Sequence, residues 1–285
     1  MRVAVTGADG FTGRFVAEAL RSAGAEPIAL RVDLTDADAV AHTVDATAFD
    51  RVIHLAGVAF AGGTDWRAFY AVNQIGSLNL LEAIARKAPG TRCVLASSAQ
   101  VYGPGAQGLI TETAPTNPAN HYAVSKRAME LGASVWHDRL DVVLARPFNY
   151  TGEGQDAQYL VPKIVDHFRR KAPVVELGNT WVKRDFGDVR SVAEAYVGLV
   201  LAQEVPPVVN IATGVVSSIA DIIDRLARIS GHRIEVQVNQ AFVRPDDVPV
   251  LGGDISVLAA TLPGWRSHDI GETLDWMYGA VREDQ

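Results

Sequence analysis

Short apolar segments alternate with longer amphipathic segments through the first half of this 285-residue chain. Short apolar runs predict buried strands, and apolar residues spaced three and four apart predict helices. The predicted strands are 2–6, 26–31, 51–56, 92–96 and 141–146, and the predicted helices are 11–23, 36–47, 67–87 and 119–138. Because strands that alternate with helices form parallel sheets with crossover helices, we expect an α/β fold with a doubly wound parallel sheet.

The pattern becomes less regular after residue 150. It contains a predicted strand at 208–212, an amphipathic helix at 218–230 and a strand at 234–238. We interpret residues 1–150 as one sheet domain and residues 151–285 mainly as a smaller C-terminal lobe. Later strands of the second part are expected to join the first sheet, so the two parts interleave.

Three glycines follow the first predicted strand in the run Gly7-Ala-Asp-Gly10-Phe-Thr-Gly13, which leads directly into a helix. In such a turn the first glycine permits a tight bend, the second lets backbone approach a pyrophosphate, and the third lets helix pack on strand. The N–H groups of the helix then point at the phosphates. Residues 1–150 are therefore predicted to be a Rossmann dinucleotide-binding domain that uses Gly7, Gly10, Phe11 and Gly13, although the spacing is G-x-x-G-x-x-G.

Polar residues after the second strand are candidates for the adenosine end of that site. Asp33 and Leu34 stand where an acidic residue and its neighbour contact adenosine, but Asp33 or Asp36 could equally cap the next helix. The residue that ends the strand is Arg31, and an arginine there could pair with a 2′-phosphate. Arg31 thus favours NADP(H), with NAD(H) left open.

The third strand ends in Leu55-Ala56-Gly57, where the backbone must pass close to a bound dinucleotide. A glycine permits that approach. These three residues are therefore added to the predicted cofactor contacts.

Tyr122 and Lys126 lie four residues apart within a predicted helix, so they share one helix face. A neighbouring cation stabilises a phenolate, and we therefore expect a lowered pKa and proton-donor function for Tyr122. Ser98 follows the fourth strand, at the edge where parallel sheets bind ligands, and could polarise a carbonyl. Alternatively, the helix pair is surface decoration and the serine satisfies local backbone groups.

Composition excludes several classes of function. A net charge of −7 and 48% hydrophobic residues predict a soluble protein without a nucleic-acid or membrane partner. Cys93 is the single cysteine, and the histidines lack metal-ligand spacing, so neither a disulfide framework nor a metal site is expected. The absence of a leader pattern and the cysteine usage predict a cytoplasmic location.

The glycine run, Ser98, Tyr122 and Lys126, with Asn73 on the intervening helix, resemble the extended short-chain dehydrogenase/reductase superfamily over nearly the whole chain. The resemblance implies that Ser98, Tyr122 and Lys126 form a catalytic triad. It also implies that Asn73, Tyr122 and Lys126 lie at the cofactor, with Lys126 bonded to the nicotinamide ribose. Members form homodimers through a four-helix interface, which implies pairing through helices 67–87 and 119–138.

Three runs in the second half resemble the branch of that superfamily that reduces GDP-4-keto-6-deoxy-D-mannose. They begin at Arg146-Pro-Phe-Asn149, Lys183-Arg184-Asp and Arg244-Pro-Asp. The resemblance implies that Asn149, Arg184 and Arg244 bind the diphosphate of a nucleotide-sugar in a substrate-binding lobe. Guanidinium forks suit bidentate phosphate contacts.

The residues after Ser98 bear on the reaction. A related 4,6-dehydratase needs a carboxylate beside the catalytic hydroxyl, and Ala99 and Gln100 cannot act as acid or base. The expected reaction is therefore NAD(P)H-dependent reduction of the C4 keto group of a nucleotide-linked 4-keto-6-deoxyhexose. Two alternatives stay open, a nucleotide-sugar 4-epimerase that retains NAD and a non-catalytic NAD(P)-binding regulatory protein.

Overall fold

The computed structural model describes residues 1–59, 65–243 and 248–280. Its main sheet has six strands in the order β10-β6-β4-β3-β1-β2, and every neighbouring pair is parallel. These strands are β1 (Arg2–Thr6), β2 (Glu26–Leu30), β3 (Arg51–His54), β4 (Arg92–Ala96), β6 (Asp141–Pro147) and β10 (Val208–Ile211). The predicted doubly wound α/β fold is confirmed.

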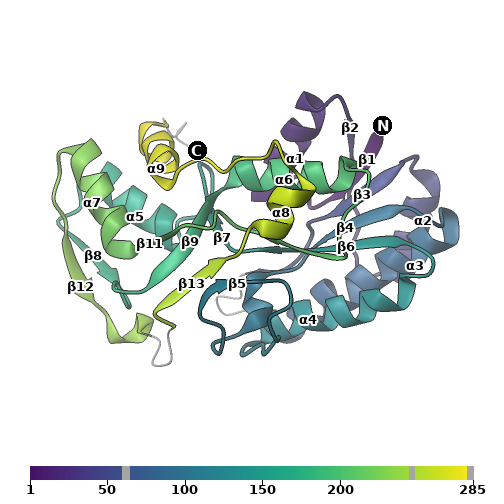
Figure 1. The fold of residues 1–285 in the computed structure, drawn as a ribbon, viewed down its shortest axis with the longest axis horizontal. Helices are drawn as coiled ribbons and strands as arrows, with labels where there is room; N and C mark the ends of the chain where they lie inside the picture. Colours follow the sequence, from purple (N-terminus) through teal and green to yellow (C-terminus); the bar gives the residue numbers. More distant parts are fainter. Residues whose placement is uncertain (60–64, 244–247, 281–285) are drawn as a thin grey trace.

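Helices cover both faces of this sheet (Figure 1). The helices α1 (Phe11–Ser22) and α6 (Val189–Leu201) pack on one face, against Val3 and Val5 of β1. On the other face, Ala4 of β1 contacts the layer formed by α2 (Ala37–Ala46), α3 (Ser77–Lys87) and α4 (His121–Ala133). Alternate residues of each strand point to opposite faces of the sheet, and both faces are covered by helices. Side chains on both faces of a strand are therefore buried in apolar cores, which explains the continuous apolar runs in the sequence.

The boundaries of three predicted elements need correction. The strand predicted at 51–56 ends at His54, and the helix predicted at 119–138 ends at Ala133 and continues as a 3-10 turn, Ser134–Trp136. The helix predicted at 67–87 consists of a π-helix, η1 (Phe69–Gly76), followed by α3. The wider π turn places Asn73 in the protein interior, where it is fully buried.

A smaller lobe lies beside the sheet domain (Figure 1). Its apolar core is formed mainly by the helices α5 (Leu160–Arg169), α7 (Ile219–Ser230) and α9 (Ile270–Gly279) and by the paired strands β8 (Val174–Leu177) and β12 (Glu235–Val238). Between lobe and domain lies a mixed sheet of β5 (Gly108–Ile110), β7 (Asn149–Thr151), β9 (Lys183–Asp188), β11 (Val216–Ser218) and β13 (Val250–Gly253). The remaining helix, α8 (Ser256–Thr261), contacts β10 of the main sheet.

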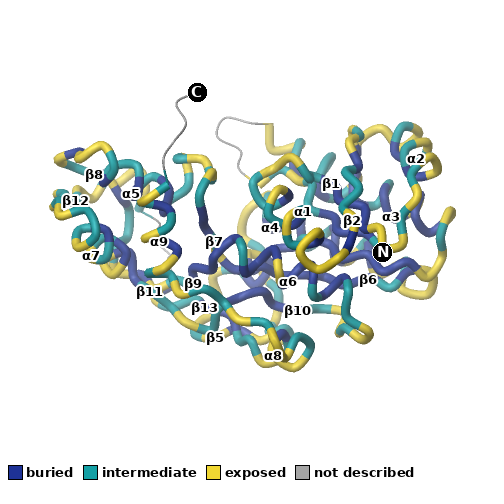
Figure 2. Tube along the Cα trace, turned by 90° about the horizontal axis from the view of Figure 1, so that it is seen from above, coloured by how far each residue is buried: buried dark blue, intermediate teal, exposed yellow. Residues whose placement is uncertain are grey.

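The chain crosses between the two parts in both directions. β5 comes from the first half and joins the mixed sheet, whereas β10 comes from the second half and completes the main sheet beside β6. Figure 2 shows the main strands as a buried layer inside more exposed helices. Within the described ranges, no helix is long and apolar enough to cross a membrane.

Candidate active site

The glycine loop between β1 and α1 is closely packed. Gly7 has a φ of +68°, and a Cβ at Gly13 would lie 2.1 Å from the carbonyl oxygen of Gly7. Only glycine fits this bend. No side chain in the described part of the chain caps α1, and its first turn carries no acidic residue. The N–H groups at the positive end of the helix are therefore available for an anion, so the loop fits the pyrophosphate of a dinucleotide.

The two carboxylates after β2, Asp33 and Asp36, form different hydrogen bonds. Asp36 caps α2, because its side chain accepts a hydrogen bond from the N–H of Ala39 at 3.0 Å. Asp33 instead accepts from the N–H and the hydroxyl of Thr35, at 2.9 and 2.7 Å, and these bonds lower its pKa. The ambiguity between the two residues is thus resolved in favour of Asp36 as the cap.

Leu34 and Arg31 of this loop differ in burial. Leu34 is buried, and a Cβ placed on Gly76 would lie 2.7 Å from the Cβ of Leu34. The side chain of Leu34 therefore belongs to the core. Arg31 is exposed, and its guanidinium forms an ion pair with Asp9 of the glycine loop. The side chain predicted to meet a 2′-phosphate therefore already has an anionic partner.

The segment after β3 runs between the glycine loop and α4. A Cβ at Gly7 would lie 2.9 Å from the amide nitrogen of Ala56, which shows how closely this segment, Leu55 to Gly57, approaches the glycine loop. A Cβ at Gly57 would lie 2.9 Å from Oδ1 of Asn73 and 3.1 Å from Nζ of Lys126. A larger residue at position 57 would therefore displace the ends of these two side chains.

The side chain of Asn73 forms hydrogen bonds with the segment that follows β3. Its Oδ1 accepts from the N–H of Val58 at 2.8 Å, and its Nδ2 donates to the carbonyl of Val58 at 2.9 Å and to Oγ of Ser125 at 3.1 Å. The side chain thus joins η1, the loop after β3 and helix α4. The structure gives it a positioning contact with the loop that we predicted to hold the cofactor.

The three predicted catalytic residues come together at the carboxyl end of β4. Ser98 lies two residues after β4, and Tyr122 and Lys126 lie in the first two turns of α4. A side-chain hydrogen bond from Ser98 lowers the pKa of Tyr122, and Nζ of Lys126 donates to the carbonyl of Ala96 at 2.8 Å. All three side chains are thus fixed against the end of one strand.

The predicted acidification of Tyr122 by Lys126 is wrong for the protein alone. Burial raises the pKa of Tyr122 to about 12 and outweighs the bond from Ser98. Lys126 is itself nearly inaccessible, and burial lowers its pKa to about 8, although Glu130 opposes that shift. The cost of desolvating both groups exceeds the benefit of placing them on one helix face. Tyr122 therefore holds its proton firmly at neutral pH.

A buried ionic network behind the triad was not foreseen. Glu130, one turn after Lys126, forms a bidentate pair with Arg146 of β6, with both N–O distances 2.8 Å. Ser97 also donates to Glu130, at 2.6 Å. Glu130 and Ser97 thus tie α4 to the end of β4, next to Ser98. The only sequence signal was a glutamate spaced four residues beyond the lysine.

Tyr150 was also missed, although it lies in a run that carried the resemblance. Its hydroxyl is 2.8 Å from Oγ1 of Thr12 at the start of α1, and its ring is parallel to that of Phe11, with centroids 6.3 Å apart. Tyr150 also raises the pKa of Tyr122. It therefore connects α1 to the segment that enters the smaller lobe.

The predicted substrate contacts are only partly described. Asn149 begins β7, which pairs with β9 so that Asn149 lies beside Phe186, two positions from Arg184. The Nδ2 group of Asn149 donates to the carbonyl of Asp185 at 3.4 Å, and Arg184 donates to the carbonyl of Val248 at 2.7 Å. The structure thus brings Asn149 and Arg184 to adjacent strands. Arg244 lies outside the described residues.

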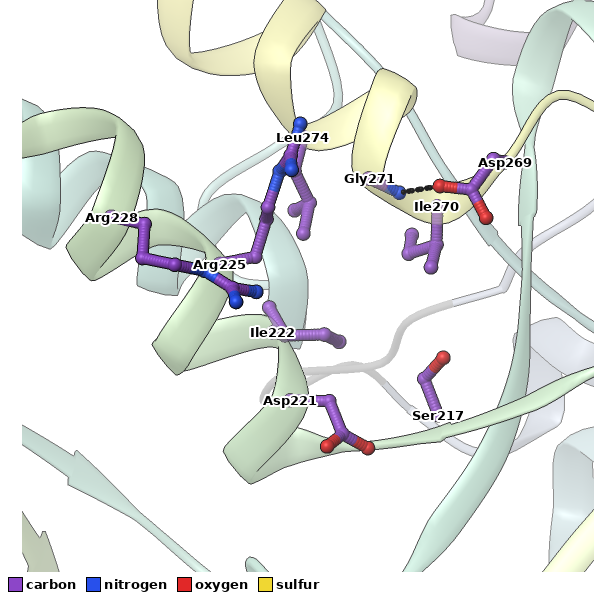
Figure 3. A pocket seen from close by; sticks show the side chains of 9 residues that line it. All are labelled: Ser217, Asp221, Ile222, Arg225, Arg228, Asp269, Ile270, Gly271 and Leu274. Carbon is purple, nitrogen blue, oxygen red and sulfur yellow. Dashed lines mark hydrogen bonds between the residues drawn. The ribbon is translucent and has the colours of Figure 1, made fainter.

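A cavity of about 210 Å³ opens elsewhere, between α7 and α9 in the smaller lobe (Figure 3). Arg225 and Arg228 of α7 line it, and Asp269 accepts from the N–H of Gly271 across its rim at 2.7 Å. Arg225 is already paired with Asp275 of α9. None of the predicted site residues lines this cavity, so it is separate from the candidate active site.

Among the described residues, no group of three His, Cys, Asp or Glu side chains is placed to hold a metal ion. The site consists of hydroxyl groups, one lysine and a glycine-rich anion cradle. Such groups can polarise a carbonyl, move a proton and hold a dinucleotide.

Comparisons with known proteins agree with this arrangement. The profile of the NAD dependent epimerase/dehydratase family matches residues 3–212. The chain is 34% identical to GDP-6-deoxy-D-talose 4-dehydrogenase of Aggregatibacter actinomycetemcomitans, over 98% of this chain and 97% of that protein. It is 31% identical to GDP-6-deoxy-D-mannose reductase of Pseudomonas aeruginosa, over 93% of this chain and 91% of that protein.

A solved structure extends the likeness to three dimensions. The structure of RMD from Pseudomonas aeruginosa complexed with NADPH superposes with a TM-score of 0.87 and 29% identity, covering 97% of each chain. The predicted family is therefore confirmed by sequence and by fold. The chain belongs to the NAD dependent epimerase/dehydratase family and is an NAD(P)-dependent enzyme of the extended short-chain dehydrogenase/reductase type.

Proposed function

We propose that this enzyme reduces the C4 keto group of a nucleotide-linked 4-keto-6-deoxyhexose, with GDP-4-keto-6-deoxy-D-mannose as the substrate. The observation that carries the proposal is the meeting of Ser98, Tyr122 and Lys126 at the carboxyl end of β4, where Nζ of Lys126 donates to the carbonyl of Ala96, in the same sheet as the glycine loop. Two relatives support the substrate, because one acts as a C4 dehydrogenase and one as a reductase of GDP-linked 6-deoxyhexoses.

The glycine loop and the N-terminus of α1 would hold the pyrophosphate of NAD(P)H. Bound NAD(P)H would supply the hydride that C4 receives. Tyr122 then donates its proton to the developing alkoxide, and Ser98 donates a hydrogen bond to the same oxygen. In the protein without cofactor, burial keeps the phenol of Tyr122 protonated at neutral pH, so the proton to be donated is present. Lys126 lies beside Gly57 and Asn73, where it can orient the nicotinamide ribose.

Asn149 and Arg184 would bind the diphosphate of the substrate from β7 and β9. The two strands form the boundary between the main sheet and the smaller lobe, so a ligand held there spans both parts. Arginine suits this role because its planar fork matches phosphate oxygens. We include Arg244 in the same role on the basis of its sequence run alone.

We also propose that the enzyme is a homodimer. Leu131 of α4 and Val135 of the 3-10 turn that follows it are exposed, and Ile75 of η1 is exposed as well. A helix surface with such apolar residues suits pairing with its own copy. Sedimentation equilibrium tests this, and a monomer mass at micromolar concentration would contradict it.

The function is tested by the variant Tyr122→Phe, assayed by consumption of NADPH and NADH with GDP-, dTDP- and UDP-linked 4-keto-6-deoxyhexoses. Removal of the proton donor should lower kcat by about 10²- to 10⁴-fold. The control Tyr278→Phe removes a hydroxyl from α9, outside the site, and should keep wild-type activity.

Two results would contradict the proposal. Full activity of Tyr122→Phe would exclude this residue as the proton donor. A wild-type protein that retains NAD and interconverts C4 epimers without consuming added NAD(P)H would instead be a 4-epimerase, the activity named for several relatives of 26–29% identity. Cofactor binding without turnover of any substrate would favour the regulatory alternative.

A further inference from the structure

Two oppositely charged side chains meet at the carboxyl ends of β1 and β2. The strands pair in parallel with Thr6 beside Leu30, so the loops that follow them emerge next to each other. Asp9 lies in the glycine loop and Arg31 directly follows β2. Nε of Arg31 is 2.7 Å from Oδ2 of Asp9, and Nη2 is 2.8 Å from Oδ1. The two N–H groups of Arg31 that could bind a phosphate are thus already bonded to a carboxylate.

This position corresponds to one particular atom of the cofactor. In a Rossmann fold, the residue at the end of the second strand faces the 2′ position of the adenosine ribose. NAD carries a neutral hydroxyl there, whereas NADP carries a phosphate with up to two negative charges. A hydroxyl can donate to the carboxylate of Asp9. A phosphate would approach the same carboxylate with like charge and would have to compete for Arg31.

The neighbouring charges act in the same direction. Asp33 lies two residues after Arg31, and its bonds to Thr35 lower its pKa and keep it ionised. Asp9, Asp33 and Arg31 together carry a net charge of −1. A binding site for the 2′-phosphate would need a net positive charge, and these three residues do not provide one.

We propose that Asp9 determines the choice of cofactor by occupying the fork of Arg31, so that the enzyme binds NAD(H) more tightly than NADP(H). This inference rests on the cofactor site of the proposed function and reverses the preference that Arg31 alone suggested. Asp9 is thus a specificity-determining residue. The structure of RMD contains NADPH, but RMD is only 29% identical to this chain, so its cofactor does not decide the preference of this enzyme.

The test measures equilibrium binding of NADH and NADPH to the wild-type protein and to Asp9→Asn and Asp9→Ser, by energy transfer from tryptophan to the bound nicotinamide. The wild type should bind NADH more tightly. Both variants should bind NADPH about tenfold more tightly than the wild type, because a repulsive charge is removed and Arg31 is released. Their affinity for NADH should change by less than about threefold.

Two further variants separate this effect from general changes in charge. Glu26→Gln removes an exposed carboxylate at the opposite end of β2 and should leave the ratio of NADH to NADPH affinity unchanged. In Asp9→Asn combined with Arg31→Gln, most of the gain for NADPH should disappear, since the phosphate then lacks its cation.

The possible failures are distinguishable. A wild type that prefers NADPH, or Asp9 variants whose affinity ratio stays within about twofold of wild type, would overturn the role of Asp9 but leave the proposed function intact. Failure of the wild type to bind either cofactor would overturn the proposed function and this inference together.

Discussion

The two bidentate arginine–carboxylate pairs of the site have nearly the same geometry and opposite surroundings. In the pair between Arg146 and Glu130, the side chains are 5% and 0% exposed. In the pair between Arg31 and Asp9, they are 69% and 68% exposed. N–O distances of 2.7 to 2.8 Å join both pairs. Burial, not bond length, therefore distinguishes them.

The surroundings determine what each pair can do. Glu130 also accepts bonds from Ser97 and Arg127, so its charge is fully satisfied inside the protein. Removing one partner of such a pair leaves an uncompensated charge, whereas an exposed pair exchanges readily for water, salt or a ligand. The buried pair therefore suits a fixed structural link between α4 and β6, and the exposed pair suits selection among ligands.

The largest expected effect comes from breaking the buried pair. Glu130→Ala should lower the free energy of unfolding by about 3–5 kcal/mol, because Arg146 would remain charged and buried. Chemical unfolding of the purified variant measures this change. Asp9→Ala, which breaks the exposed pair, should unfold at the same denaturant concentration as the wild type.

A double variant sharpens this prediction. Glu130→Leu combined with Arg146→Met replaces the charges with apolar side chains, and it should be more stable than either single variant. A loss for Glu130→Ala below about 1 kcal/mol would show that the two pairs differ less than their burial implies.

The sequence predicted the main sheet because each of its strands is a short apolar run with its own turn signal. It failed on the helix predicted at 67–87, since the shift to π hydrogen bonding at Phe69–Gly76 does not alter the apolar pattern. At the end of the π turn, Gly76 packs closely against Leu34, a contact between residues that are distant in sequence.

For the candidate site, the sequence pointed to residues that share one local element and missed residues that are joined by contacts distant in sequence. Tyr122 and Lys126 share a helix, so their spacing was informative. The pKa of Tyr122 was predicted with the wrong sign, because it depends on burial by elements that periodicity does not position. The contact between Thr12 and Tyr150 joins residues 138 positions apart, and no local pattern encodes it.

An intermediate effect is expected in the dependence of stability on pH. Burial alone would raise the pKa of Glu130, but the bonds and charge of Arg146, with Ser97 and Arg127, hold it below its ordinary value of 4.5. The ionised group therefore stabilises the fold fully above about pH 4.5. As the pH falls further, through the folded pKa, the unfolded state binds the proton first and this stability is lost.

This behaviour is measured as unfolding free energy at a series of pH values for wild type, Glu130→Gln and Asp9→Asn. The difference between wild type and Glu130→Gln should be constant from about pH 8 to about pH 5 and should shrink below about pH 4.5. Asp9→Asn should follow the wild-type curve, since solvent screens its pair. A difference for Glu130→Gln that persists unchanged to about pH 3 would contradict an ionic role.

The smallest expected effect is the response to salt concentration. Salt should screen the exposed pair of Asp9 and Arg31 but not the buried pair of Glu130 and Arg146. At about 50 mM NaCl the charge of Asp9 reaches a bound 2′-phosphate, whereas at about 500 mM the screening length approaches the size of the contact. The gain in NADPH affinity from Asp9→Asn should therefore shrink severalfold with added salt, and the destabilisation by Glu130→Ala should stay constant, because solvent ions do not reach the buried pair. Titrations at both salt concentrations measure this. A gain that is independent of salt would mean that Asp9 acts through the shape of the glycine loop, since a purely steric effect is not screened.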